Sequence, residues 1–585
     1  MENVNVTIDN KQVSVPKGST ILDASKVAGV HIPTLCYLEN VHQIGACRVC
    51  LVEVKGGRAL QTACTYPVTE GMVVTTSTQR VRSARKAVIE LMLSAHRQEC
   101  TACGRNLNCE LQAVAKQLGV QESPYPGAMP KRIDDTSTPS IVRDSSKCIL
   151  CRRCVTVCQN VQGVGALFPV DRGFDSAIVP AMKKELGDVA CVLCGQCISV
   201  CPVNAIYEKD NTAEVWKALA DPGKHVVVQT APAVRAAIGE EFGMPAGTRA
   251  TGKMVAALRA VGFDKVFDTD FTADLTIIEE GNELLQRLQT GGTLPMVTSC
   301  SPGWIKYIEH FYPDFLPHLS TCKSPQQMFG ALAKTYYAEK MGIKPEDIYV
   351  VSIMPCTAKK FECDREEMSA NPGIPDVDVV LTTREAAKMI REMGIDFANL
   401  ADEKFDEPLG ISTGAAVIFG ATGGVMEAAL RTVYEVVTGE TLPSIDLTAV
   451  RGLEGVKEAT VKVGDLNVKV AVASGLANAG KLMEKIKNGE ADYHFIEIMC
   501  CPGGCLGGGG QPIPTNDAVR KLRMKAIYEE DANLPLRKSH ENPAVTALYE
   551  EFLVKPLGHK SHEILHTTYT RRAKYPKVEE EMPVG

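Results

Sequence analysis

The sequence lacks any uninterrupted apolar run of the roughly 18 residues that a membrane-spanning helix needs. Its first ten residues, MENVNVTIDN, contain acidic and polar residues but no apolar signal-peptide core, so we expect no secretory signal and a cytoplasmic location. A basic excess is also missing. Lys and Arg number 63 against 70 Asp and Glu, a net charge of -7. That balance argues against a nucleic-acid partner, which would favour a basic patch.

Nucleotide-binding patterns are missing as well. The glycine-rich stretch CPGGCLGGGGQP (501–512) is not followed by G-K-[ST], which argues against a Walker phosphate loop. A second glycine-containing stretch, GATGGVMEAALR (420–431), could open a helix but is only a weak nucleotide signal. No G-x-G-x-x-G follows a predicted strand, so we expect no NAD or flavin site on this chain.

Cysteine, by contrast, is abundant. The chain has 585 residues, roughly four domains at about 150 residues each. Its 45% apolar and 23% charged residues are ordinary for a packed globular protein. The chain contains 22 cysteines, and fifteen of them lie in the first 201 residues in four bunches. A disulfide scaffold would be short and secreted, so these thiols are expected to be metal ligands or catalytic groups.

The third and fourth bunches give the strongest signal. CILCRRCVTVC (148–158) and CVLCGQCISVCP (191–202) both read C-x2-C-x2-C-x3-C, the two-cluster ferredoxin run in which the fourth Cys of each run ligates the other cluster. Gln159 replaces the usual Pro after the first run. The alternative, a pair of zinc sites, usually has widely separated C-x2-C pairs. We therefore predict two [4Fe–4S] clusters, one held by Cys148, Cys151, Cys154 and Cys201 and the other by Cys191, Cys194, Cys197 and Cys158.

The first bunch lies in a different setting. VNVTID and QVSVP alternate as strands do, residues 19–28 could form a short helix, and a strand LVEVKG follows the second and third thiols. The spacing C-x10-C-x2-C-x13-C differs from the plant ferredoxin spacing. It resembles a [2Fe–2S] β-grasp ferredoxin, similar to the N-terminal domain of the large peripheral subunit of respiratory complex I, with a structural zinc site as the alternative. The expected ligands are Cys36, Cys47, Cys50 and Cys64.

The second bunch reads H-x3-C-x2-C-x5-C. Residues 79–98 are predicted to form an amphipathic helix with His96 in its last turn. A lone His is usually a surface or capping residue, but beside three thiols at ligand spacing it becomes the fourth ligand. Complex I subunits and one family of hydrogenases look similar here, with a [4Fe–4S] cluster held by one His and three Cys. The expected ligands are His96, Cys100, Cys103 and Cys109, and the imidazole is expected to raise the cluster potential.

Four iron–sulfur clusters in a row suggest electron transfer to or from a site in the remaining chain. Apolar runs there end near Cys300, Cys356 and Cys500, and the run KHVVVQTAPAVR ends in the same way without a thiol. Helical stretches such as TREAAKMIREMG lie between them, which indicates a parallel α/β arrangement. Ligands of such sheets bind outside the carboxyl ends of the strands, so these distant cysteines can converge.

At these residues the sequence resembles the [FeFe]-hydrogenases. That family's signatures are TSCCPxW, MPCxxKxxE and ExMxCxxGCxxGGGxP. They read here TSCSPGW (298–304), MPCTAKKFE (354–362) and EIMCCPGGCLGGGGQP (497–512). The resemblance covers essentially the whole chain, including all four N-terminal bunches, and the domain order is similar to that of long monomeric clostridial hydrogenases.

The resemblance implies an H-cluster, a [4Fe–4S] cube bridged through one cysteine sulfur to a diiron centre with CO, cyanide and a dithiolate amine. Cys356 and Cys501 would ligate the cube and Cys505 would be the bridge. Around the diiron centre it implies packing by Met354 and Met499, a hydrogen bond from Lys359 to a cyanide, and a pocket lined by Ala231 and Pro232.

The first signature departs from the family at one position. Most members have adjacent cysteines there, of which the second ligates the cube and the first relays protons. Here Cys300 is followed by Ser301. Cys300 could take over ligation, which thiolate chemistry favours, or Ser301 could ligate through oxygen while Cys300 remains the relay, which the alignment favours.

The proton route is also carried over from the resemblance. Glu280, Glu283 and Ser320 match the family's relay, which reaches the site through Cys300. A buried Glu with a raised pKa suits such a relay, whereas the alternative is a solvated helix face. Cys322, Cys363 and Cys500 are given no role.

The predicted fold is therefore multidomain α+β. A β-grasp [2Fe–2S] domain (1–78) precedes a [4Fe–4S] domain with one His and three Cys ligands (79–137) and a two-[4Fe–4S] ferredoxin domain (138–209). An α/β H-cluster catalytic domain (210–520) and a segment resembling the family's small subunit (521–585) follow. The His residues of that last segment are expected to pack or cap rather than to ligate.

Two functions remain in competition. The first is reversible 2H⁺ + 2e⁻ ⇌ H₂ by an iron hydrogenase, and the second is a non-catalytic electron-transfer, sensory or cluster-assembly protein. The intact motifs favour catalysis, whereas Ser301 is the feature that speaks for the second reading. Flavin-bearing partner subunits would couple the chain to NADP(H) or NAD(H) in a hetero-oligomer, or ferredoxin would serve instead. Maturation enzymes would supply the diiron unit.

Overall fold

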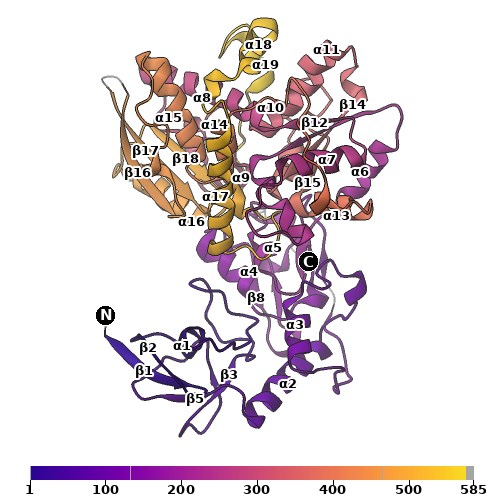
Figure 1. The fold of residues 1–585 in the computed structure, drawn as a ribbon, viewed down its shortest axis with the longest axis vertical. Helices are drawn as coiled ribbons and strands as arrows, with labels where there is room; N and C mark the ends of the chain where they lie inside the picture. Colours follow the sequence, from indigo (N-terminus) through magenta and orange to yellow (C-terminus); the bar gives the residue numbers. More distant parts are fainter. Residues whose placement is uncertain (1, 132, 464–465, 575–585) are drawn as a thin grey trace, which may run out of the picture.

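The computed structural model describes residues 2–131, 133–463 and 466–574. The N-terminal domains form the lower part of the molecule in Figure 1, and the larger region from residue 210 onward, which is predicted to be catalytic, lies above them. Among the described residues, none of the helices combines the length and the apolar character that crossing a bilayer requires.

The N-terminal domain is a five-stranded sheet with the order β2-β1-β5-β3-β4. Val4, Val6 and Ile8 are buried on one face of β1 because side chains alternate along a strand. Thr20 and Asp23 cap the helix α1 that packs on this sheet. The strands and helix are β1 (Asn3–Ile8), β2 (Lys11–Pro16), β3 (Leu51–Val54), β4 (Gln61–Thr62), β5 (Val73–Thr75) and α1 (Ile21–Val27). The two strands, the short helix and the strand after Cys50 agree with the sequence prediction.

The following domain holds two helices, α2 (Gln79–Ser94) and α3 (Glu110–Gln117). The predicted helix over 79–98 is therefore too long, and the placement of His96 in its last turn is wrong. The helix ends at the Ala95 cap, where backbone N–H groups bond the carbonyls of Met92 and Leu93. Arg97 then bonds the carbonyl of Ser146, which directs the chain toward the next domain.

The two-cluster domain is built from very short elements. Its three-stranded sheet has the order β10-β7-β6, and β8 pairs with β9 as a hairpin. Helices α4 and α5 each begin after a residue with positive φ, Arg152 or Gly195. The bounds are β6 (Asp134–Asp135), β7 (Ile141–Asp144), β8 (Phe168–Val170), β9 (Ala177–Val179), β10 (Ile206–Glu208), α4 (Arg153–Thr156) and α5 (Gln196–Val200).

The catalytic region contains two four-stranded sheets. One has the order β12-β11-β14-β15 and is wholly parallel. The other has the order β13-β18-β17-β16, in which only the β16–β17 hairpin is antiparallel. The strands are β11 (His225–Thr230), β12 (Lys265–Asp268), β13 (Met296–Val297), β14 (Ile348–Met354), β15 (Val379–Thr382), β16 (Val456–Val463), β17 (Leu466–Ser474) and β18 (Phe495–Met499). The parallel arrangement was predicted, whereas the division into two sheets was not.

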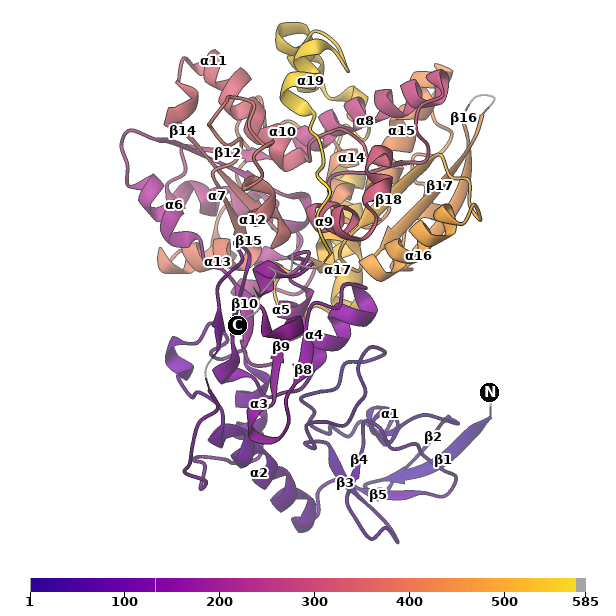
Figure 2. The same cartoon turned by 180° about the vertical axis from the view of Figure 1, so that it is seen from behind.

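Helices cover both sheets (Figures 1 and 2). This covering explains why β14 and β18 are buried along nearly their whole length instead of alternating between buried and exposed side chains. The helices are α6 (Thr212–Leu219), α7 (Thr251–Val261), α8 (Asp270–Thr290), α9 (Pro302–Phe311), α10 (Pro325–Leu332), α11 (Ala338–Met341), α12 (Ala358–Cys363), α13 (Thr383–Glu392), α14 (Gly414–Val417), α15 (Gly424–Thr438) and α16 (Leu476–Lys487).

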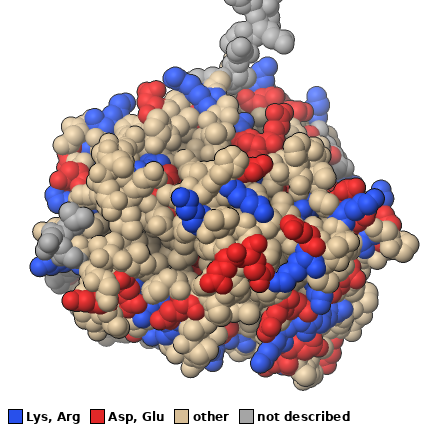
Figure 3. Space-filling view, turned by 90° about the horizontal axis from the view of Figure 1, so that it is seen from above, with Lys and Arg blue, Asp and Glu red and all other residues tan. Residues whose placement is uncertain are grey.

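The C-terminal segment lies across the catalytic region as α17 (Asp517–Asn533), α18 (Pro543–Leu548) and α19 (His559–Leu565). Asp531 of α17 forms a buried ion pair with Arg431 of α15. Glu279 of α8 accepts hydrogen bonds from Tyr549 and Ser561, which fixes α19 near α8. Figure 3 shows the top face, on which acidic and basic side chains are interspersed, so this face carries no basic stripe of the kind that nucleic acids need.

Candidate active site

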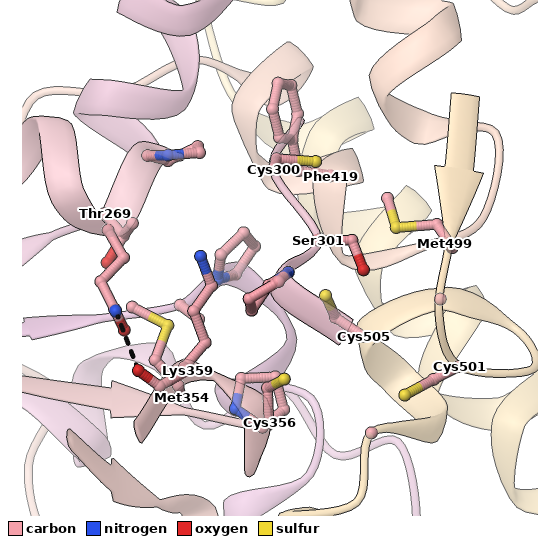
Figure 4. A pocket seen from close by; sticks show the side chains of 18 of the residues that line it. Thr269, Cys300, Ser301, Met354, Cys356, Lys359, Phe419, Met499, Cys501 and Cys505 are labelled. Atoms are coloured by element: carbon pink, nitrogen blue, oxygen red, sulfur yellow. Dashed lines mark hydrogen bonds between the residues drawn. The ribbon is translucent and has the colours of Figure 1, made fainter. Parts of the chain in front are cut away.

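The segments that follow β11, β14 and β18 meet at one cavity. Carboxyl ends of parallel strands share an edge, so residues far apart in sequence converge there. The cavity of about 80 Å³ is several times the roughly 10–15 Å³ that one water needs. Its lining includes the predicted residues Ala231, Pro232, Cys300, Ser301, Met354, Cys356, Lys359, Met499, Cys501 and Cys505 (Figure 4).

The thiols of this cavity are deeply buried. Burial and the neighbouring thiol Cys501 raise the pKa of Cys505 to about 12, and the same effects raise the pKa of Cys356. Buried thiolates therefore need a cation to offset the cost of desolvation. Five cysteines line the cavity, and three of them, Cys356, Cys501 and Cys505, suit an iron–sulfur group, whose usual ligands are thiolates.

Glycines allow the loop that carries Cys505 to approach the strand ends. A Cβ on Gly508 would lie 2.0 Å from the carbonyl oxygen of Pro355, and one on Gly504 would lie 2.6 Å from the backbone nitrogen of Thr422. Any larger residue would push the loop away from the cavity. This close packing explains the glycine-rich stretch without a phosphate ligand.

Cys300 and Ser301 face different parts of the cavity. In Figure 4 the Ser301 oxygen lies on the side of Cys505, whereas the Cys300 sulfur points toward Phe419. Ser301 Oγ accepts a hydrogen bond of 3.2 Å from the backbone N–H of Cys500. Burial raises the pKa of Cys300 well above its ordinary value, and Glu280 raises it further.

Lys359 lines the cavity but donates elsewhere in this structure. Its Nζ donates to Ser324 Oγ and to Glu362 Oε2, each at 2.7 Å. These bonds place a buried cation beside the cavity. Met354 and Met499 contribute apolar thioether side chains from the ends of β14 and β18.

The predicted proton route is brought together on α8 and the segment after α9. Ser299 Oγ lies 3.4 Å from Glu280 Oε1, and Ser320 Oγ donates to Glu283 Oε2 at 3.1 Å. Burial is the main cause that raises the pKa of Glu280 to about 7, and the nearby Glu283 raises it further. Glu280 and Glu283 are thus buried and not part of a solvated face. Arg287, which pairs with Glu283 at 2.6 Å, lies outside the sequence prediction, as does Ser299.

The four thiols of the first bunch also converge. Cys50 Sγ and Cys64 Sγ lie 3.4 Å apart, and Cys36 lies within hydrogen-bonding range of Cys47 and Cys64. All four are buried. Their role as [2Fe–2S] ligands stays a prediction that this arrangement suits.

The second bunch surrounds the turn between α2 and α3. A turn of 3-10 helix runs from Cys100 to Ala102, and its carbonyl at Cys100 accepts from the backbone N–H of Cys103. Cys109 lies just before α3. His96 Nδ1 is buried without a hydrogen-bond partner, and burial lowers the pKa of its imidazole, as expected for a neutral ring available to a metal.

The ferredoxin thiols fall into two cavities. Cys148, Cys151, Cys154 and Cys201 line one of them. Cys158, Cys191, Cys194 and Cys197 line the other. This is the crossed grouping expected from the two runs, and ligation itself stays a prediction.

The second of these cavities lies directly against the candidate active site. Thr357 Oγ1 donates to the carbonyl of Leu193 at 2.7 Å. A Cβ on Gly509 would lie 2.5 Å from the carbonyl oxygen of Cys194. Cys500 lies within hydrogen-bonding range of both Cys194 and Cys501, although sequence reasoning gave it no role. The ferredoxin domain and the active-site loops are therefore in van der Waals contact.

The [2Fe–2S] domain is joined to the ferredoxin domain through His42. Its Nε2 lies 3.0 Å from the carbonyl oxygen of Cys151, and its Nδ1 lies 2.6 Å from Thr156 Oγ1. Arg153 donates to both oxygens of Glu110, at 2.7 and 2.8 Å, and so joins the domain of the second bunch. The three regions that carry the predicted cluster ligands are thus in direct contact.

Some cavity residues were missed by the sequence reasoning. Thr269, Gln326 and Phe419 line the cavity. Thr269 directly follows β12, so recognising that strand would have found it by the same strand-end argument. Gln326 and Phe419 carry no local signal. Of the thiols without a role, Cys322 is buried and Cys363 is partly exposed at the end of α12.

Comparison with known families covers most of the chain. Residues 224–509 match the family described as "Iron only hydrogenase large subunit, C-terminal domain", and residues 517–572 match "Iron hydrogenase small subunit". Residues 1–79 match a "2Fe-2S iron-sulfur cluster binding domain", residues 85–124 an "NADH-ubiquinone oxidoreductase-G iron-sulfur binding region", and residues 147–205 a "4Fe-4S dicluster domain".

Curated relatives match over nearly the full chain. The chain is 54% identical over 584 residues to the NADP-reducing hydrogenase subunit HndD of Solidesulfovibrio fructosivorans, which covers 98% of this chain and 100% of that protein. Iron hydrogenase 1 of Clostridium pasteurianum is 42% identical and covers 97% of this chain and 100% of its own. Among solved structures, the [FeFe]-hydrogenase HydA1 from Chlamydomonas reinhardtii matches with a TM-score of 0.55 and 46% identity, covering 61% of this chain and 99% of that one.

Proposed function

The chain belongs to the iron-only hydrogenase family, and from this membership we propose that it interconverts H₂ with protons and electrons at the cavity beneath β11, β14 and β18. The observation that carries the proposal is the convergence of Cys356, Cys501 and Cys505 with Lys359 on one buried cavity. The two cavities lined by the ferredoxin thiols measure about 20 and 30 Å³ against about 80 Å³ here, so this cavity has room for more than a cube.

The buried thiols would hold the H-cluster. Cys356, Cys501 and Cys505 would ligate its cube, with Cys505 as the bridge. Ser301 would take the remaining cube position, because its oxygen lies on the side of Cys505. When bound, the diiron unit with its CO, cyanide and dithiolate amine supplies the iron Lewis acid and amine base for heterolytic H₂ chemistry.

The surrounding side chains would position and shield that group. Lys359 presents a buried ammonium to the cavity, and a cation there favours an anionic ligand such as cyanide. Met354 and Met499 line the cavity with apolar atoms and thereby exclude water.

Protons would pass between the cavity and the outside through Cys300, Glu280, Ser320 and Glu283. The Glu280 pKa of about 7 suits a group that gives and takes a proton near neutral pH. Its Oε2 is buried without a hydrogen-bond partner, so a neutral carboxyl group is well tolerated. Arg287 would hold Glu283 at the outer end.

Electrons would travel along one [2Fe–2S] and three [4Fe–4S] clusters. The ligands would be the four thiols of the first bunch, His96 with its three thiols, and the two crossed sets of the ferredoxin domain. The contact between Gly509 and Cys194 makes the ferredoxin domain the last step before the active site. The domains 1–78 and 79–137 form the far end of the molecule and would receive the electron partner (Figure 1).

Partner subunits that bind flavin and NADP(H) would complete a hetero-oligomeric enzyme, as the relative named as an NADP-reducing hydrogenase subunit suggests. NAD(H)-linked subunits or a free ferredoxin are the alternatives, and a cytoplasmic location stays a prediction. A non-catalytic sensory or cluster-assembly role is the competing function, favoured only by Ser301.

An infrared spectrum of protein made anaerobically with hydrogenase maturation enzymes tests the proposal. Fe–CO and Fe–CN stretching bands that shift under H₂ are expected, since ordinary iron–sulfur proteins lack these ligands. The absence of such bands from protein with its N-terminal clusters assembled would favour the non-catalytic role.

A further inference from the structure

A second group of side chains that could bind a metal shares Glu283 with the proton route and adds two residues, Cys322 and His566, that have no role in it. The Cys322 sulfur, an imidazole nitrogen of His566 and a carboxylate oxygen of Glu283 all lie within 4.8 Å of one another. All three residues are buried. Sulfur, nitrogen and oxygen ligands of this kind bind Zn²⁺ at about 2.0–2.3 Å, so small side-chain shifts would bring the three donors onto one ion.

The backbone holds two of these donors side by side. The N–H of Thr567 donates to the carbonyl of Thr321, and the N–H of Lys323 donates to the carbonyl of Leu565, both at 2.8 Å. These bonds flank Cys322 and His566, which therefore form an antiparallel pair without mutual hydrogen bonds. Side chains of such a pair lie on one face with Cβ atoms about 4.5–5.5 Å apart.

Neighbouring groups orient the His566 imidazole and the Glu283 carboxylate. His566 Nδ1 lies 2.8 Å from Thr321 Oγ1, and its Nε2 lies 3.3 Å from Glu279 Oε2. Whichever nitrogen binds a metal, the other keeps an oxygen partner, as is usual for metal-ligating histidines. Arg287 and the backbone N–H of Thr321 hold the Glu283 carboxylate.

The local charge favours a cation. Glu279 and Glu280 lie beside Glu283 on α8, and Arg287 is paired with only one of these three carboxylates. The pKa of the Cys322 thiol is raised by burial and then by Glu283, Glu280 and Glu279, which reflects the same negative field. A divalent ion would reverse this effect and displace the thiol proton.

We propose that Glu283, Cys322 and His566 form a buried Zn²⁺ site that inhibits the enzyme when it is filled. Binding replaces the Cys322 S–H bond with an S–Zn bond and releases one proton to solvent. The inhibitory part rests on the proposed function. A zinc-bound Glu283 would no longer serve as acceptor for Ser320, and the route from Glu280 outward would be interrupted.

Two variants and two matched controls test the site. C322A and H566Q each remove one donor and leave the proposed catalytic residues in place. H540Q removes a histidine from the other described group of potential ligands, Glu435, His540 and Glu541, which lacks a thiol and is partly exposed. C363A removes a partly exposed thiol elsewhere.

The holoenzyme would be titrated with Zn²⁺ in a metal buffer, and the ion followed by X-ray absorption at the zinc edge, to which iron does not contribute. One zinc with sulfur and nitrogen ligands is expected in the wild type, with H₂ uptake falling in proportion to its occupancy. C322A and H566Q should weaken Zn²⁺ binding by at least about 10–100-fold, which is the loss seen when only a group that hydrogen-bonds a metal ligand is removed. H540Q and C363A should bind as the wild type does.

Zinc without a sulfur ligand, or affinity unchanged in both C322A and H566Q, would refute the site. Full occupancy of this site with undiminished H₂ turnover would refute its inhibitory role. If the protein shows no H-cluster bands and no turnover, the proposed function fails, while the zinc-edge spectra of wild type and variants still decide whether the metal site exists.

Discussion

Gln196 and Gly507 are joined by a hydrogen bond of 2.8 Å between the Gln196 Nε2 amide and the Gly507 carbonyl, across 311 positions of sequence. The same amide lies within hydrogen-bonding range of the Cys501 thiol. One buried side chain of the ferredoxin domain therefore contacts both the glycine loop and an expected ligand of the cube.

Replacing this amide is expected to change the potential of the cube. Q196L removes a donor to the Cys501 sulfur, and such hydrogen bonds stabilise the more negative reduced state. A hydrogen bond to a charged group is worth about 1.5–3 kcal/mol, and only part of this differs between oxidation states, so we expect a fall of tens of millivolts. A spectroscopic redox titration measures it. An unchanged potential in Q196L would show that the amide only joins the domains.

Single substitutions of Cys300 and Ser301, where the first signature departs from the family, should show which residue ligates the cube and which transfers protons. C300A should assemble the cube but lose H₂ turnover by about 10²–10⁴-fold, the usual contribution of a positioned acid–base group. S301C should keep the activity and shift the cube potential, because sulfur replaces oxygen. Activity assays and electron paramagnetic resonance of the cube provide the measurements. Loss of the cube in C300A would instead make Cys300 the ligand.

Glu280 should be needed for proton transfer and not for cluster binding. E280Q keeps the shape of the side chain but cannot ionise, so turnover should fall by about 10²–10⁴-fold while the infrared bands of the H-cluster remain. E279Q is the neighbouring control, because Glu279 bonds Tyr549, Ser561 and His566 and not Ser320. Equal losses in both variants would point to a general structural effect on α8.

The raised pKa of Glu280 also predicts a pH-dependent stability. Between the ordinary value of 4.5 and the folded value of about 7, the folded protein holds a proton that the unfolded chain has lost. The free energy of unfolding therefore falls as the pH rises through this window, by about 3 kcal/mol in total. E280Q lacks this effect, so its apparent Tm should exceed that of the wild type at pH 8 by more than at pH 5. Parallel profiles of Tm against pH in the wild type and E280Q would contradict a raised pKa for Glu280.

His96 should be required for one cluster. H96A is expected to lose the iron of one [4Fe–4S] cluster, because the unpartnered Nδ1 atom would no longer be present as a ligand. H96C should retain the iron but lower the potential of that cluster, since replacing cysteine by histidine raises potentials in Rieske centres. Iron analysis and a redox titration provide the readouts. Full iron content in H96A would exclude His96 as a ligand.

Cysteine spacing predicted most of the site because it reports which ligands share a cluster. The two C-x2-C-x2-C-x3-C runs predicted that the fourth thiol of each run joins the first three of the other, as seen in the two ferredoxin cavities. The apolar runs that end near Cys300, Cys356 and Cys500 likewise predicted that strand ends meet at one cavity.

Other features leave no local trace in the sequence. Beyond the end of α2, the backbone N–H of Arg97 donates to the carbonyl of Ser146, a residue of another domain. The helical periodicity of the sequence carries no sign of this contact, so the predicted helix was too long. Gln196 and Phe419 gain their roles from tertiary packing alone. Cys322 and His566 are 244 positions apart, and only the short antiparallel pairing of their segments brings them together.

The docking of the C-terminal segment on Glu279 bears on how the protein responds to dilution. Tyr549, Ser561, His566 and the backbone of Leu557 all contact this one buried carboxylate. Because the segment is covalently attached, this docking is intramolecular and its effective concentration is set by the tether and not by the amount of protein. The segment is therefore expected to stay docked on Glu279 even at the lowest enzyme concentrations used in an assay.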